Sequence, residues 1–393
     1  MLAVTANWGL TDGSLGGTRP TTASRWLDRV RMSAVRAGFG PTGRYRPVED
    51  LTLVFAGDTF DMALSDRWTG RDRPWHGGPH GRAARRAALA AVFREAARPI
   101  ARLRSWLRHG LAVPAADTRG RPAPGFRCRV NLAAVLLVGD RDGRLVELTD
   151  QADRLGVMVG SAWTDGRHEI RHGHEFDPLR FSADDPDRPA CEEGRPTLAE
   201  SISADLIVPF GVAVRGLPAA WPSIRPILGR LAASGVGGEG LAGQMQTALA
   251  RLPPPHRAAV ASAWQRSVEG WFLATRREPP ACDAGLDAPA ALAAWLAAAG
   301  RGLPAPEPAA LTRWLEPACP PGHPAMTTVI GHLAPVRTGR GGVVCLGDAM
   351  PRLMIRPRPD AAADFVMLDQ PPAGSAVVRV GEASPGRGVV DAA

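Results

Sequence analysis

The stretch LTLVFAGDTFDM, residues 51–62, joins an apolar run to a polar turn. The run is short and ends at Gly57, as expected for a central strand that is covered on both faces. Asp58 and Asp61 follow directly, so two carboxylates stand just after the strand. Ligands of α/β proteins bind beyond the carboxyl ends of strands, and the stretch therefore predicts both a central strand and part of a site.

Further apolar runs predict strands elsewhere in the chain, at 1–4, 130–139, 326–331, 342–347 and 376–380. Stretches with apolar residues at helical spacing lie between them. One is 81–110, which Pro99 is expected to kink or break, and another is 288–300. The alternation of strands and helices predicts an α/β protein.

The segment 197–320 differs from its surroundings, because it is rich in Ala, Leu, Pro and Trp and is expected to be mainly helical. The strand-rich segments lie on either side of it. We therefore expect a core formed by residues 1–196 and 321–381, a helical insertion or cap at 197–320, and a flexible tail at 382–393.

The composition excludes several enzyme classes. All 47 basic side chains of the 393-residue chain are arginine. Without lysine there is no P-loop lysine, no protein-kinase strand lysine and no Schiff-base lysine. The net charge of +8 is compatible with a polyanionic partner, but Asp and Glu are interspersed with the arginines, so arginine-mediated nucleic-acid binding is the less favoured hypothesis.

The five cysteines indicate a reducing compartment, because they are odd in number and form no CxxC pair. The N-terminus lacks the basic segment of a signal peptide. No run approaches the roughly 18 apolar residues that indicate a membrane span. We therefore expect a cytoplasmic protein without a membrane span.

Three more polar clusters follow predicted strands: GDRD at 139–142, RHGHEFD at 171–177 and GHLAP at 331–335. Taken singly, a Gly-Asp pair is a common turn, and a lone histidine is more often a structural polar residue than a ligand. Together the imidazoles and carboxylates indicate a composite site for a divalent cation such as Mn, Fe, Ni or Zn.

The order of these motifs resembles that of the calcineurin-like metallophosphoesterases, especially the bacterial branch of UDP-diacylglucosamine hydrolase-like enzymes. The matching motifs are GDTFD at 57–61, the turn at 139–142, HGH at 172–174 and GHLAP at 331–335. The resemblance covers residues 1–180 and 325–380. It implies a two-sheet β-sandwich flanked by helices, here with a large helical insertion, and a pair of metal ions that activate water for attack on phosphorus.

The resemblance implies roles for particular residues. Asp58 corresponds to the bridging carboxylate, and Asp140 stands where the family has an asparagine ligand. His172 and His332 correspond to two imidazole ligands of the same metal. Arg141 replaces the turn histidine that protonates the leaving group, and an arginine can grip phosphate but cannot act as a general acid.

The family's first metal position has lost its ligands. Ala6 and Trp8 stand in place of an Asp-x-His motif, and Ala334 replaces the last histidine. Two-metal hydrolysis uses ions about 3.5 to 4 Å apart, so the chain is expected to hold one ion instead of a pair.

Three other histidines are candidates for substrate contacts. His174 lies in the same HGH motif as His172, whereas His76 and His80 follow the GDTFD turn. For His76 and His80, exposed loop histidines without a role at the site are the favoured interpretation.

Two functions remain open. The first is a metal-dependent phosphoesterase that hydrolyses a phosphorylated small molecule or a phosphodiester at a mononuclear site. The second is a catalytically inactive protein of the same fold with a binding or scaffold role.

Overall fold

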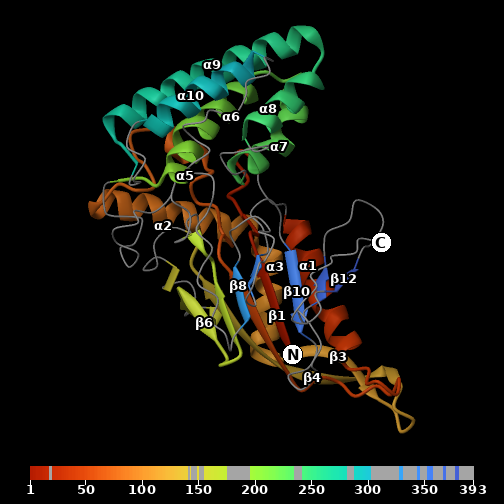
Figure 1. The fold of residues 1–393 in the computed structure, drawn as a ribbon. Coiled ribbons are helices and arrows are strands. Elements are labelled where there is room, and N and C mark those ends of the chain that lie inside the picture. Colours follow the sequence, from red (N-terminus) through yellow and green to blue (C-terminus); the bar gives the residue numbers. More distant parts are fainter. Residues whose placement is uncertain are drawn as a thin grey trace, which may run out of the picture.

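The computed structural model describes residues 1–16, 20–139, 142, 148–149, 155–174, 195–233, 241–280 and 287–301, together with five strands nearer the C-terminus. Two β-sheets and a set of helices make up the architecture (Figure 1). The chain is therefore a mixed α/β protein, which confirms the predicted class at this level. Within the described ranges, no helix is both long and apolar enough to cross a membrane.

The larger sheet has eight strands in the order β12-β11-β10-β1-β2-β4-β3, with β5 paired to β4. At its centre β1 (Leu2–Ala6), β2 (Asp50–Ala56) and β4 (Pro122–Leu137) run parallel, so their carboxyl ends lie at one edge of the sheet. The remaining strands are β3 (Leu111–Ala116), β5 (Met158–Gly160), β10 (Arg352–Arg356), β11 (Val366–Leu368) and β12 (Val377–Arg379).

One strand is longer than the sequence predicts. The segment 112–125 is rich in Pro and Gly and reads as a loop, yet β3 and β4 form an antiparallel hairpin through it. β3 is at the end of the sheet, and an edge strand tolerates proline because one side of its backbone needs no partner. The hairpin register shifts between Pro114 and Ala115, which accommodates the extra residues.

The smaller sheet has the order β6-β7-β8-β9. Its strands are β6 (Ala162–Thr164), β7 (His168–Arg171), β8 (Thr327–Ile330) and β9 (Val343–Cys345). β7 and β8 are parallel, and Arg171 pairs with Ile330. This pairing joins the middle of the chain to its C-terminal part.

The two sheets share an apolar core. Alternate residues of β1, β2 and β4, among them Val4 and Val54, pack there with Ile170 of β7 and Trp163 of β6. The opposite side chains of the same strands, such as Leu53 and Phe55, pack against the helices in a second core. Burial on both faces explains why the central strands are almost uninterrupted apolar runs.

Three helices form this second core with the larger sheet: α1 (Pro20–Ala37), α2 (Gly78–Glu95) and α3 (Ala97–His109). The predicted break in 81–110 occurs at Ala96, and Pro99 lies in the first turn of α3. Proline is tolerated there because the first amides of a helix have no intrahelical acceptor.

Residues 198–300 contain helices that surround a further core, which includes Phe210, Trp264 and Trp271, and Leu15 and Leu64 from the strand-rich part join it. The elements are α5 (Leu198–Ser201), the π-helix η3 (Ile202–Ile207), α6 (Val208–Arg215), α7 (Trp221–Ala233), α8 (Leu241–Ala250), α9 (Pro254–Arg277) and α10 (Asp287–Gly300). They gather at one end of the molecule, beyond α2 (Figure 1). A short 3-10 helix, η1 (Asp66–Thr69), contacts α6 from the strand-rich part.

Candidate functional site

The loops that leave β1 and β2 run side by side beyond the carboxyl edge of the larger sheet. The amide of Asn7 donates to the Gly57 carbonyl at 3.1 Å, and that of Gly9 donates to the Asp58 carbonyl at 2.9 Å. Asn7 and Asp58 have positive φ angles of 55° and 50°. Left-handed backbone at such residues costs about 1 to 3 kcal/mol and persists where the surrounding contacts impose it. The paired loops thus hold the buried Asp58 in a fixed orientation.

His172 reaches the same edge from the end of β7 and is fully buried. Its Nδ1 lies 2.9 Å from the carbonyl oxygen of Ala56, which can only accept, so Nδ1 carries a proton and donates it. Its Nε2 then faces Asp58, 3.5 Å from Oδ1. Histidines that bind metals are commonly oriented in this way, with one ring nitrogen held by a backbone carbonyl and the other presented to the ion.

Two glycines allow this close packing. Gly57 has a φ of 85°, and a Cβ there would overlap the imidazole ring of His172. A Cβ on Gly139 would overlap the carboxylate and amide of Asp58. The sequence pattern marked both glycines only as strand ends, but their missing side chains make room for the polar groups of the site.

Asp142 is a site residue that the sequence analysis missed. Its carboxylate accepts from the amides of Phe60 and Gly139, both at 2.7 Å, and so joins the loops after β2 and β4. Burial raises the pKa of Asp142, and the Asp58 carboxylate raises it further, to about 7, against the opposing effect of these two hydrogen bonds. The signal in the sequence is the second aspartate of GDRD, whereas the resemblance gives a role only to the first, Asp140.

The arrangement brings two buried carboxyl groups and the Nε2 lone pair of His172 close together, and oxygen and imidazole nitrogen are common ligands of divalent cations. Two donors that each lie about 2.1 Å from one ion are themselves about 3.0 to 3.5 Å apart, depending on the angle between them. Nε2 of His172 and Oδ1 of Asp58 are separated by 3.5 Å, which is too long for a good hydrogen bond. The chemistry and spacing of this pair suit a shared divalent ion.

The other expected ligands, Asp140 and His332, lie outside the described residues, as do Arg141 and Ala334. In the described part of the chain, no group of three or more His, Cys, Asp or Glu side chains is placed to hold a metal ion. Of the four expected ligands, the structure brings Asp58 and His172 together.

The three candidate substrate histidines have different surroundings. The ring of His174 lies 5.0 Å from that of His172, so His174 is beside the site. His76 instead approaches Glu278, the residue that follows α9, with Nε2 3.7 Å from Oε2, and His80 is exposed in the first turn of α2.

Ala6 and Trp8 enter different cores. Ala6 is buried between the two sheets, whereas Trp8 packs on the helix side, edge-on to Phe55 with ring centroids 5.0 Å apart. The Trp8 indole donates to Thr5 Oγ1 at 2.8 Å. Residues two apart in a strand face the same way, but the positive φ of Asn7 turns the chain between these two. Trp8 therefore acts as a core residue.

Comparison of the chain with protein-family models, with curated proteins and with solved structures finds no match.

Proposed function

We propose that the chain is a metal-dependent, phosphoesterase-like hydrolase that acts on a phosphate mono- or diester. The observation that carries this proposal is the pair of buried carboxylates, Asp58 and Asp142, next to Nε2 of His172. Two carboxylates in a low-dielectric environment repel each other, and a bound cation relieves that repulsion. The proposal takes one ion, Mn, Fe, Ni or Zn.

When bound, such an ion polarises a phosphoryl oxygen and lowers the pKa of a coordinated water. Asp58 and His172 would hold it, with Asp140 and His332 as the further ligands that the sequence suggests. The Ala56 carbonyl keeps the proton of His172 on Nδ1, so that Nε2 keeps its lone pair.

The neighbouring residues have supporting roles in this proposal. Asp142 is a positioning residue, because its two backbone hydrogen bonds hold the loop of Asp58 against the loop after β4. His174 lies where it would contact a substrate bound at the site. Arg141 would pair with phosphate charge, as arginine does in many phosphate sites.

A second function is favoured by one observation. Trp8 stands where the resembling family has a metal ligand, and its indole is buried in the apolar core, where it can bind no ion. A site with one metal position can bind a phosphate ester without hydrolysing it. The alternative is therefore a catalytically inactive binding or scaffold protein with the same site.

The test is to load the purified chain with Mn²⁺, measure its metal content, and follow hydrolysis of bis(p-nitrophenyl) phosphate and p-nitrophenyl phosphate. We expect close to one equivalent of metal and metal-dependent turnover. His172→Ala should lose both, whereas His109→Ala, which changes an exposed histidine at the end of α3, should lose neither. Bound metal without turnover would favour the inactive protein, and absence of both would exclude a metalloenzyme.

A further inference from the structure

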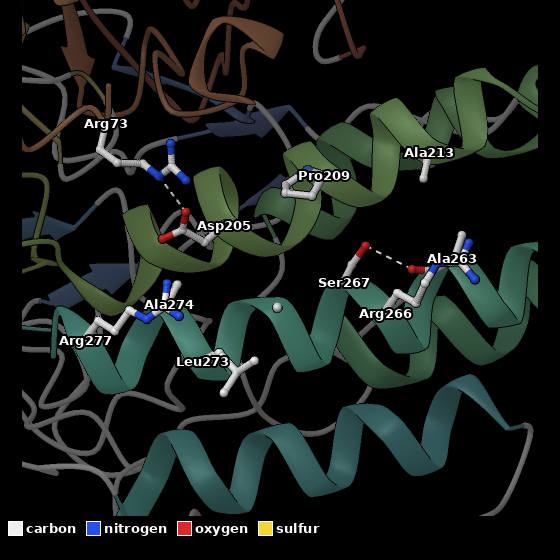
Figure 2. A pocket seen from close by; sticks show the side chains of 11 residues that line it. Arg73, Asp205, Pro209, Ala213, Ala263, Arg266, Ser267, Leu273, Ala274 and Arg277 are labelled. Carbon is white, nitrogen blue, oxygen red and sulfur yellow. Dashed lines mark hydrogen bonds and ion pairs between the residues drawn. The ribbon is translucent and has the colours of Figure 1, made fainter. Parts of the chain in front are cut away.

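A cleft of about 480 Å³ lies in the helical region, between α9 and the continuous run of η3 and α6 (Figure 2). Its walls are mostly small or apolar: Pro209 and Ala213 line one side, and Ala263, Gly270 and Ala274 line the other. The cleft volume is in the range of specific binding sites. It is separate from the site of Asp58 and His172, whose residues do not line it.

The cleft is a long groove along α9. The residues of α9 that line it recur every three or four positions from Ala263 to Arg277, and so occupy one face of the helix. At a rise of about 1.5 Å per residue, these four turns extend about 21 Å. This length suits a helical segment better than a compact small molecule.

The middle of the groove is open and apolar. A Cβ on Gly270 would meet no atom within 4 Å, so a side chain from outside can enter at this position. Leu273, one turn further along α9, is 54% exposed although it is a large apolar residue. Open space at Gly270 next to an exposed leucine is the kind of surface that an apolar helix face covers in helix packing.

The charges lie toward the ends of the groove. Arg266 and Arg277 are eleven positions apart on α9, and within the described ranges neither forms an ion pair. Arg266 donates to the Ser262 hydroxyl at 2.6 Å. These two guanidinium groups are therefore available to carboxylates of a ligand.

Arg73 is different, because its charge is already matched. Its Nε donates to buried Asp205 at 2.6 Å (Figure 2). Its Nη1 donates to the carbonyls of Trp68, Gly70 and Asp72. The Arg73–Asp205 pair is thus a fixed wall of the groove, and the uncompensated charge comes from Arg266 and Arg277.

We propose that this groove binds an acidic amphipathic helix of a partner protein. The apolar face of that helix would cover Gly270 and Leu273, and carboxylates about three turns apart on it would pair with Arg266 and Arg277. The charges of Arg266 and Arg277 indicate an acidic partner, and the length and mostly apolar lining of the groove indicate a helix. The proposal is independent of the hydrolase activity.

The experiment is a display selection of helix-forming 18-residue peptides on the full-length chain, followed by fluorescence-polarisation titration of the enriched peptides. We expect enriched peptides with acidic residues about three turns apart and leucine or a similar residue between them. Their Kd should rise about tenfold or more in the Arg266→Glu, Arg277→Glu double variant and in Gly270→Leu, whose side chain occupies the open space at that position. Arg276→Glu is the matched control, since Arg276 is an exposed neighbour that does not line the groove.

Gly270→Leu tests the groove without a large cost in folding, because its side chain would project into open space and glycine is a poor helix former. Thermal unfolding of each variant checks this. The proposal would be overturned if the selection enriched no peptide. It would also be overturned if the enriched peptides bound Gly270→Leu and the double arginine variant as tightly as the wild type. Enriched peptides without acidic residues would overturn the proposed partner.

Discussion

Gly57 and His172 lie so close together that a single methyl group on Gly57 would overlap the imidazole ring. Gly57→Ala should therefore destabilise the protein by about 2 kcal/mol or more, because it adds this overlap to the strain of an alanine at positive φ. The free energy of unfolding in urea measures the loss. The same variant should lose bound Mn²⁺ if His172 is a ligand.

Gly43→Ala is the matched control for that experiment. Gly43 also has a positive φ, 73°, but a Cβ there would meet no atom within 4 Å. It should show only the backbone strain, about 1 kcal/mol. Equal losses for the two variants would mean that the contact between Gly57 and His172 contributes nothing.

Asp142→Asn should destabilise the protein by about 1 to 3 kcal/mol, because an amide cannot accept at both of its polar atoms. In the wild type, Oδ1 accepts from Phe60 and Oδ2 from Gly139, so one buried N–H would face another donor. Relief of the repulsion between Asp142 and Asp58 offsets part of the loss.

Asp117→Asn is the comparison for Asp142→Asn. There a single oxygen, Oδ1, accepts from the amides of both Arg119 and Arg121 in an exposed turn, and an asparagine can keep both bonds. It would lose only the contact of Oδ2 with the Arg121 guanidinium, and an exposed ion pair contributes about 0 to 1 kcal/mol. The free energy of unfolding in urea should fall clearly less in Asp117→Asn than in Asp142→Asn. If Asp142→Asn is as stable as the wild type, Asp142 is not the positioning residue that we propose.

The sequence predicts the parts of the fold that depend on local pattern. The strand at 51–57 agrees with β2, since its apolar run is buried on both faces. The sequence does not predict the first half of β4. This segment is a strand because it pairs with β3, whereas its Pro-rich composition is typical of a loop. Contacts between distant segments are equally hidden. The Asp142 carboxylate accepts from the amide of Gly139 in its own loop and from that of Phe60, 82 positions earlier, and no spacing in the sequence encodes the second contact.

Arg73→Ala should destabilise the protein by about 2 to 3 kcal/mol at pH 7, because it leaves the buried Asp205 carboxylate without its cation. Burial already raises the pKa of Asp205 above 3.8, and Arg73 opposes that rise. The folded state therefore binds the Asp205 proton more tightly than the unfolded state. The free energy of unfolding falls as the pH rises from 3.8 to the folded pKa of Asp205, and it stays lower above that pKa. Without Arg73 this decrease is larger, and it should disappear as the pH falls toward 3.8.

The check is urea unfolding of wild type and Arg73→Ala between pH 7 and pH 4. Arg73 also donates to three carbonyls, and the loss of those bonds does not depend on pH. The Arg73→Ala, Asp205→Asn double variant isolates the ionic part, since its difference from Asp205→Asn should be independent of pH. If Arg73→Ala lowers the free energy of unfolding by the same amount at every pH between 4 and 7, the unpaired Asp205 carboxylate is not the cause of the destabilisation.

Binding of a divalent ion at Asp58 and His172 should stabilise the folded chain, because the site exists only when the strands are assembled. At a free ion concentration one hundred times Kd, the gain is about 2.7 kcal/mol. Tm should therefore rise on addition of Mn²⁺ or Zn²⁺ and fall again with a chelator. His172→Ala should abolish this shift, and His109→Ala, at an exposed position, should retain it. An equal rise of Tm in the two variants would place the ion elsewhere, since His172 would then contribute nothing to its affinity.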